Sequence, residues 1–339
     1  MRRRGARNFA ARLLAWYARQ QRDLPWRRTR DPYRIWVSEI MLQQTRAQAV
    51  IPYYERFLSR FPTVAALAEA AESDVLAAWS GLGYYSRARN LQKAARAIVA
   101  AGGFPRDYEA LRRLPGIGPY TAAAIASIAF GQPHAVLDGN VLRVLARLEN
   151  DPADIASSRT RARFQQMAGR LLEPKDPAAF NQAMMELGAT VCLPRAPRCL
   201  LCPVAQDCRA LAAGTAEQLP VKLRPGRQER IEQTLVRVEK RGRLLLRQRP
   251  ADAGRMAGFW ELPAVEDLPG VRLNGALGSF RHTITRHLYV FTVRSGTLAR
   301  APRGFRWLSG AELGALPLST AARKALRLGN FPQGFVPKL

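Results

Sequence analysis

The sequence lacks any apolar run of the roughly 20 residues that a membrane-spanning helix requires. Near the start, Arg12 and Arg19 interrupt the apolar residues, which argues against a secretory signal. We therefore expect no membrane partner and a cytoplasmic protein.

Acidic residues are scarce: 26 Asp and Glu stand against 53 Lys and Arg, which gives a formal net charge of +27. An excess of this size attracts a polyanion through counterion release. Arginines on solvated surfaces alone would produce the same excess, so the charge is only a first indication. Nucleic acid is the expected partner, and a nucleoid-associated location follows from it.

Cysteine is also scarce, and all four thiols lie between residues 192 and 208, so they cannot tie distant parts of the fold together. Their spacing, C-x6-C-x2-C-x5-C, allows four thiolates to surround one metal centre, and it leaves both a structural zinc and an iron-sulfur cluster open. Arg195 and Arg198 lie in the first loop of this motif. They are candidate contacts to a phosphate backbone, or simply solvated arginines. The candidate metal ligands are Cys192, Cys199, Cys202 and Cys208.

The length of 339 residues favours two domains. Residues 8–211 follow the pattern of short amphipathic helices without a strand, and Asp31-Pro32 and Ser73 are typical helix starts. Residues 234–238 and 244–246 are strand-like and flank a turn at 240–242. The sequence thus predicts a mainly α domain (1–211), a linker (212–230) and a smaller α+β domain (231–339).

A glycine-rich turn, LPGIGPYT, opens an alanine-rich helix at residues 114–121. Gly116 and Gly118 let the backbone approach a ligand closely, and the unpaired N–H groups of the helix start suit a phosphate. The turn would then bind the DNA backbone without reading its sequence. An ordinary connection between two helices would show the same pattern.

Two carboxylates lie in contrasting surroundings. Glu39 shares a helix face with Ile35 and Trp36, so burial should raise its pKa and keep a proton available for a leaving group. Asp138 precedes an apolar helix, where backbone N–H groups should keep it ionised. Such a pair suits cleavage of a glycosidic bond through an oxocarbenium-like sugar. An interfacial Glu and a plain helix cap are the competing interpretations.

Seven separated motifs, in order, resemble adenine DNA glycosylases of the helix-hairpin-helix superfamily, to which endonuclease III also belongs. The match covers nearly the whole first domain. The motifs are LPWR (24–27), SEIMLQQT (38–45), GLGYYSRARNL (81–91), LPGIGPYTA (114–122), LDGNVLRVL (137–145), MELGA (185–189) and the cysteine loop (192–208).

The resemblance implies a base-flipping enzyme that removes adenine mispaired with 8-oxoguanine or guanine in double-stranded DNA, and we expect it to act as a monomer. Glu39 matches the acid that protonates adenine N7. Asp138 matches the carboxylate that stabilises the sugar cation, and Asn140 and Tyr120 match the groups that support these two. The cysteine match favours a 4Fe-4S cluster over zinc, with a role in structure and DNA docking.

Further positions match the family's substrate contacts. Gln44 and Tyr84 match residues that wedge into the duplex as adenine leaves the stack. The adenine pocket corresponds to Leu24, Trp26, Arg27 and Glu186.

The second domain resembles Nudix-like domains over residues 244–263, but no R-E-x-x-E-E-x-G metal helix follows Gly258, so nucleotide hydrolysis is not expected. In this position it resembles the family's reader of 8-oxoguanine. The reading loop corresponds to residues 280–287, where Ile284-Thr285-Arg286 replaces the usual Phe-Ser-His. Thr285 keeps a hydroxyl and is the candidate contact, and His287 could replace the missing imidazole.

Three other functions remain open. An endonuclease III-like enzyme for oxidised pyrimidines would need a lysine nucleophile at the place of Tyr120, and no Lys lies between Lys93 and Lys175. We therefore expect a monofunctional glycosylase. A noncatalytic iron-sulfur protein that binds DNA would not need Glu39 and Asp138. A free-nucleotide pyrophosphatase is disfavoured by the missing acidic helix.

Overall fold

The computed structural model describes residues 3–223, 229–250, 252–253, 256–284 and 287–329, without the side chains of residues 3–7 and 315. The chain divides into two compact units. The first unit comprises Met1–Ala68 and Lys93–Arg224, and the second comprises Glu69–Gln92 and Pro225–Leu339. The limits of the functional domains expected from the sequence stay a prediction.

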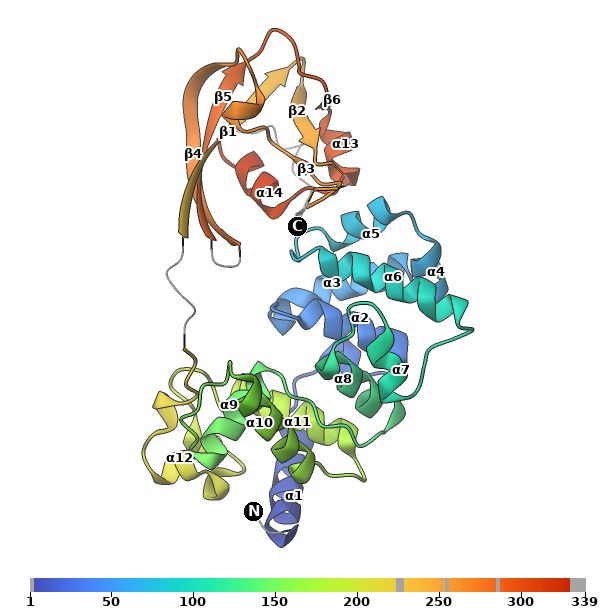
Figure 1. Cartoon of the computed structure of the whole chain (residues 1–339), viewed down its shortest axis with the longest axis vertical. Helices are drawn as coiled ribbons and strands as arrows, with labels where there is room; N and C mark the ends of the chain where they lie inside the picture. The colour runs from blue at the N-terminus through green and yellow to red at the C-terminus, as the bar shows by residue number, and fades with distance from the viewer. Residues whose placement is uncertain (1–2, 224–228, 251, 254–255, 285–286, 330–339) are drawn as a thin grey trace. The chain divides into compact units, whose positions relative to one another are not determined.

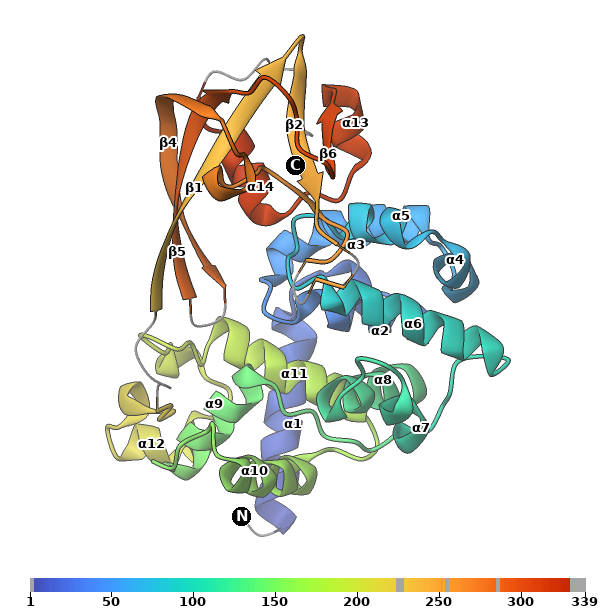
Figure 2. The ribbon, with the colours of Figure 1, turned by 45° about the horizontal axis from the view of Figure 1, so that its top comes forward.

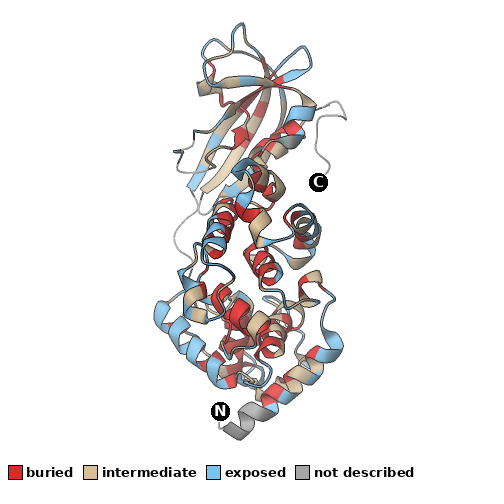
Figure 3. Ribbon diagram, turned by 90° about the vertical axis from the view of Figure 1, so that its right-hand side faces the viewer, coloured by how far each residue is buried: buried red, intermediate tan, exposed pale blue. Residues whose placement is uncertain are grey.

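The first unit is helical in all its described regular elements (Figure 1). Buried residues line the inner faces of its helices, and exposed residues cover the outer ones (Figure 3). Its elements are α1 (Arg3–Gln20), η1 (Pro25–Arg27), α2 (Pro32–Leu42), α3 (Ala47–Arg60), α4 (Val64–Glu69), the end of α6 (Ser86–Ala100), α7 (Tyr108–Arg113), α8 (Pro119–Phe130), α9 (Gly139–Glu149), α10 (Ser158–Leu171), α11 (Pro177–Thr190), η2 (Cys199–Leu201), η3 (Ala205–Asp207), α12 (Arg209–Ala212) and η4 (Ala216–Gln218).

Local sequence explains where the central helices begin and end. The Asp31 side chain accepts a hydrogen bond from the Tyr33 N–H, and Pro32 is the first residue of α2, as expected. Alanine-rich α8 begins with a proline and ends at Gly131 in the left-handed conformation. The expected cap at Ser73 is wrong, because α5 (Glu72–Trp79) begins one residue earlier, with Glu72 and Asp74 in its first turn.

Much of the segment 212–223, which the sequence assigns to the linker, packs on the first unit. Leu219 and Ala216 are buried in an apolar cluster with Ala210. The Val221 carbonyl accepts a hydrogen bond from the Ile155 N–H at 3.0 Å. The described chain therefore stays in contact with the helical unit up to this point, because small apolar residues alternate with the polar ones.

The second unit contains a six-stranded sheet in the order β3-β2-β1-β5-β4, with β6 paired to β2. The β1–β5 pair is parallel and the other pairs are antiparallel. Long strands β1, β5 and β4 run side by side and twist together (Figure 2). The elements are α5, the start of α6, β1 (Glu229–Lys240), β2 (Arg243–Gln248), β3 (Trp260–Glu261), η5 (Val265–Asp267), β4 (Arg272–Ile284), β5 (His287–Thr297), β6 (Phe305–Leu308), α13 (Gly310–Ala315) and α14 (Thr320–Leu326).

The expected hairpin is confirmed. Lys240 pairs with Arg243, and Arg241 and Gly242 form the turn with positive φ values of 51° and 67°. The mainly α first part and the smaller α+β second part are therefore confirmed. No helix in the described part of the chain is long and apolar enough to cross a membrane.

A close approach between α9 and α11 at Gly188 yields a stability prediction. A Cβ atom on Gly188 would lie 2.6 Å from the Asn140 Cβ. We expect Gly188→Ala to force the two helices apart and to lower the free energy of unfolding by ~1–3 kcal/mol. Urea unfolding followed by circular dichroism measures this loss.

The matched control is Gly169→Ala, which also lies within a helix but whose Cβ would meet nothing within 4 Å. Helix propensity predicts that this control gains up to ~1 kcal/mol. Equal stability of Gly188→Ala and wild type would contradict the close packing.

Candidate active site

An open cleft of about 1450 Å³ lies in the first unit, where the ends of several helices meet. It brings together eleven of the residues selected from the sequence. These are Leu24, Trp26, Arg27, Glu39, Gln44, Gly116, Gly118, Tyr120, Asp138, Asn140 and Glu186.

Glu39 is buried on α2, and its Oε2 accepts a hydrogen bond of 2.6 Å from the Tyr120 hydroxyl in the first turn of α8. Burial raises the pKa of Glu39 to about 7, although the bond from Tyr120 lowers it. The Tyr120 pKa is raised well above its ordinary value, chiefly by burial and then by the charge of Glu39. The tyrosine therefore stays a hydroxyl donor at neutral pH.

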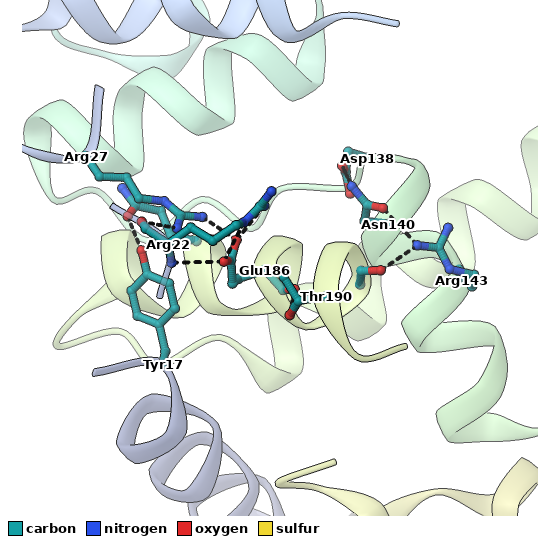
Figure 4. Close-up of polar contacts among 10 residues, drawn as sticks. Tyr17, Arg22, Arg27, Asp138, Asn140, Arg143, Glu186 and Thr190 are labelled. Carbon is teal, nitrogen blue, oxygen red and sulfur yellow. Dashed lines mark hydrogen bonds and ion pairs between the residues drawn. The ribbon is translucent and has the colours of Figure 1, made fainter. Parts of the chain in front are cut away.

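Asp138 is the N-cap of α9, and its Oδ1 accepts a 2.7 Å bond from the Val141 N–H. Its Oδ2 accepts 2.9 Å from the Asn140 amide. The sequence predicts that such bonds favour the ionised form, and they do lower the pKa of Asp138, but burial raises it by more. Arg143 donates 2.8 Å to Asn140 Oδ1 (Figure 4), which turns the Asn140 amide nitrogen toward Asp138.

Glu186 is buried on α11 between two arginines (Figure 4). Arg22 donates to both carboxylate oxygens at 2.8 Å and through its backbone N–H at 3.1 Å, and Arg27 adds a bond of 2.7 Å. Burial opposes ionisation, but these bonds outweigh it and lower the pKa of Glu186 to about 2. The four donors fill all the acceptor positions of the carboxylate.

Two candidate contacts are not among the described residues that line the cleft. Tyr84 belongs to the second unit, where its side chain is 50% exposed. Thr285 lies outside the described residues. Gln44, on the cleft, and Tyr84 both have a left-handed backbone, with φ of 58° and 49°. This conformation is unfavourable for side chains of this kind and often marks functional positions.

The DNA-backbone candidates are all exposed. Gly118 caps the start of α8, and Gly116 precedes it with φ of 77°. A Cβ on Gly118 would meet nothing within 4 Å, so this helix start is open on that side. Arg195 and Arg198 are exposed in the cysteine loop, which follows α11.

The four cysteines are partly buried and lie within electrostatic range of one another. Burial, then the charges of the other three thiolates, raise the pKa of Cys202 to about 12, against one backbone hydrogen bond. Buried Arg147 donates 3.2 Å to Cys192 Sγ. Among the described residues, no three His, Cys, Asp or Glu side chains are grouped as ligands of a single metal ion.

Sequence reasoning missed two residues of the site, Arg22 and Arg143. Arg143 lies inside the motif at 137–145 and Arg22 comes two residues before the LPWR motif, so their position in or beside a motif was the available signal. The partner of Arg22, Glu186, is 164 positions away and becomes visible only in three dimensions, whereas Asn140 lies three residues before Arg143 on α9.

The raised pKa of Glu39 predicts a pH-dependent stability. Below pH 4.5 the carboxyl is protonated in both the folded and the unfolded protein, so it has no effect. Between pH 4.5 and about 7 only the unfolded protein releases the proton, so stability falls as pH rises. We expect Glu39→Gln to avoid this loss and to be more stable than wild type at pH 8 by roughly 3 kcal/mol.

Urea unfolding of both proteins at pH 5 and pH 8 measures this difference, which should nearly vanish at the lower pH. A constant difference at both pH values would argue that Glu39 titrates normally.

Comparisons with known proteins agree with this geometry. Residues 37–169 match the model of the HhH-GPD superfamily of base excision DNA repair proteins. The chain is 38% identical to the Mus musculus protein named adenine DNA glycosylase, over 94% of this chain and 77% of that protein. The Homo sapiens protein of the same name is 36% identical, over 94% of this chain and 73% of that protein.

A solved structure of a thermostable thymine-DNA glycosylase is also similar, with a TM-score of 0.55 and 29% identity, over 62% of this chain and 98% of that one. The similarity thus includes the helical fold, and the alignments to the mouse and human proteins extend over most of the second unit. The chain belongs to the adenine DNA glycosylase family of the HhH-GPD superfamily of base excision DNA repair proteins.

Proposed function

We propose that the protein, acting as a monomer, hydrolyses the N-glycosidic bond of adenine mispaired with 8-oxoguanine or guanine in double-stranded DNA. One observation carries the proposal: a buried carboxyl with a pKa of about 7, Glu39, lies in the same cleft as Asp138. A protonated acid and a second carboxylate are what cleavage through a sugar cation requires.

Glu39 is the general acid of this proposal. Tyr120 donates to Oε2, so that oxygen is an acceptor and Oε1 is left to carry the proton. At neutral pH a large fraction of Glu39 is protonated. Transfer of this proton to adenine N7, as in the family, would turn the base into a neutral leaving group and weaken the bond to the sugar.

Asp138 would stabilise the positive charge that develops on the sugar. Both of its oxygens accept hydrogen bonds, from Val141 and Asn140, so the carboxylate is held in one orientation. Arg143 in turn holds Asn140. The charge stabilisation is therefore prepared before the bond breaks, and little reorganisation is needed during the reaction.

Leu24, Trp26 and Arg27 would line the adenine pocket together with Glu186. Because the acceptor positions of Glu186 are filled, an adenine amine can bind there only if a donor leaves. The side chain of Arg22 is 42% exposed and that of Arg27 only 11%, so we infer that Arg22 gives way.

Duplex binding would use Gly116 and Gly118 at the start of α8, together with Arg195 and Arg198. Gln44 and Tyr84 would wedge into the duplex, where inserted side chains offset the cost of unstacking. The exposure of both residues and their left-handed backbone support this role.

The second unit would read 8-oxoguanine on the opposite strand. Its support is the alignment to the mouse protein, which extends over 94% of the chain, and the β4–β5 hairpin that carries residues 280–284 and 287. His287 is held near this hairpin's end by Glu229, at 3.1 Å. The hydroxyl of Thr285 stays a candidate contact.

A 4Fe-4S cluster is the proposed cofactor, held by Cys192, Cys199, Cys202 and Cys208. Four thiols in one loop, with the buried Arg147 guanidinium beside one sulfur, fit a group that takes one thiolate per iron. When bound, the cluster would fix the loop for DNA docking and take no part in releasing the base.

The decisive experiment measures single-turnover base release from duplexes with adenine opposite 8-oxoguanine, guanine, cytosine or thymine, and from a duplex with an oxidised pyrimidine. We expect release from the first two, with little strand cleavage before alkali, because Tyr120 stands where a lyase needs an amine. The rate should fall tenfold per pH unit above about 7, as Glu39 loses its proton. Glu39→Gln should lose ~10²-fold or more of the rate while still binding the duplex.

Tyr33→Phe is a suitable control, because its hydroxyl bonds to the Phe61 carbonyl outside the cleft lining. Release of the oxidised pyrimidine with cleavage of the strand would instead favour an endonuclease III-like activity. Wild-type rates for Glu39→Gln would exclude Glu39 as the acid.

The cofactor is tested by metal and sulfide analysis of the purified protein. We expect iron and acid-labile sulfide in equal amounts, and a lower unfolding temperature for Cys199→Ser, because that variant removes one thiolate ligand. Zinc without iron or sulfide would contradict the cluster.

A further inference from the structure

The loop of residues 81–84, which presents the exposed Tyr84, has an unfavourable backbone conformation. Gly81, Gly83 and Tyr84 have positive φ values of 109°, 71° and 49°. The strain falls on Tyr84, because glycine tolerates this region and tyrosine does not. Such a loop keeps its shape only if its surroundings hold it.

Side chains of the two adjoining helices hold the loop. The Arg87 guanidinium donates to the carbonyls of Leu82 and Gly83 at 3.1 Å each. It also lies over the rings of Tyr84 and Trp79, at 5.6 and 5.4 Å. The Trp79 indole N–H adds a bond of 3.2 Å to the Gly83 carbonyl. All of these groups are local in sequence.

A second set of contacts connects the loop and its flanking residues to a part of the second unit that is far away in sequence. The Ser80 hydroxyl donates to the Leu318 carbonyl at 3.1 Å. The Tyr85 hydroxyl accepts from the Gly81 N–H and donates to Leu318, at 3.4 Å in both cases. Its ring packs on Phe259, with 3.9 Å between centroids.

The residues that these contacts reach, Leu318 and Phe259, belong to the well-packed interior of the second unit. Leu318 and Phe259 are both fully buried. Leu318 belongs to the sheet's apolar core and forms a bridge with Trp260, the first residue of β3. The Arg89 guanidinium adds a bond to the Ala257 carbonyl beside Phe259. The loop is thus fastened to the sheet core itself.

We propose that Ser80 and Tyr85 are positioning residues through which the sheet of the second unit holds Tyr84 ready to enter the duplex. The inference rests on the proposed function, in which Tyr84 is a wedge. A ring that enters a base stack is pushed back by the displaced bases, so it is effective only on a support that does not yield. The hydroxyls of Ser80 and Tyr85 provide this support without touching DNA.

The test is the double variant Ser80→Ala, Tyr85→Phe, which removes both hydroxyls and keeps the packing on Phe259. We expect single-turnover adenine release from the 8-oxoguanine mispair to slow roughly tenfold, since each hydrogen bond is worth several-fold. With adenine opposite an abasic site, where extrusion costs less, the loss should be on the order of twofold. Ser295→Ala, which removes a hydroxyl bond to Gly275 elsewhere in this unit, should keep the wild-type rate.

A double-mutant cycle distinguishes an effect on the position of Tyr84 from a general loss of structure. If the hydroxyls act through the wedge, they should have almost no effect in a Tyr84→Ala background. An equal loss with and without Tyr84, or no loss at all, would overturn the proposal.

Hydrogen exchange tests the support without any activity. The amides of residues 81–84 should exchange faster in the double variant, with a larger increase than the amides of the helical unit show. If wild type releases no adenine, the proposed function fails, and this exchange decides the inference alone. Unchanged exchange would refute it in either case.

Discussion

Two buried guanidinium groups on α9 connect the cysteine loop, the segment at Leu219 and the active-site residue Asn140. Arg147 is 1% exposed and donates to the carbonyls of Leu219 and Leu193 and to Cys192 Sγ. Arg143 donates to the Cys192 carbonyl and to Asn140. A buried cation without acceptors is strongly unfavourable, so these acceptors must stay in place. The cysteine loop, the segment at Leu219 and the orientation of Asn140 therefore depend on one helix.

Contacts with arginine give the carboxyl groups of the cleft different pKa values. Glu39 and Glu186 are both buried, but only Glu186 accepts bonds from guanidinium groups, and their pKa values are about 7 and about 2. Asp138 has a raised pKa in spite of its capping bonds. The difference in pKa between a protonated and an ionised carboxyl is thus largest for Glu39 and Glu186. The sequence suggested Glu39 and Asp138 as the contrasting pair. A low pKa is achieved here by a bidentate cation, which backbone N–H groups alone do not match.

The sequence predicted what depends on local pattern. The start of α2, the turn at residues 240–242 and the convergence of Glu39, Tyr120 and Asp138 follow from spacing and motif. What it could not predict depends on partners far along the chain. Arg22 looks like a surface arginine until Glu186, 164 positions away, is placed beside it. The cleft as a site was therefore predictable, and its electrostatics were not.

The same limit applies to the division of the chain. Residues 69–92 carry a motif of the helical domain, yet they cluster with the sheet because Leu318 and Phe259 bind them. Removing everything after residue 223 would take away the proposed lesion reader and, with it, the support of Tyr84. Its effect on base release would then combine two causes. Lesion reading is therefore better separated by substituting exposed residues of the β4–β5 hairpin, such as Arg281 and Thr283, because they lie outside the apolar core that contains Leu318.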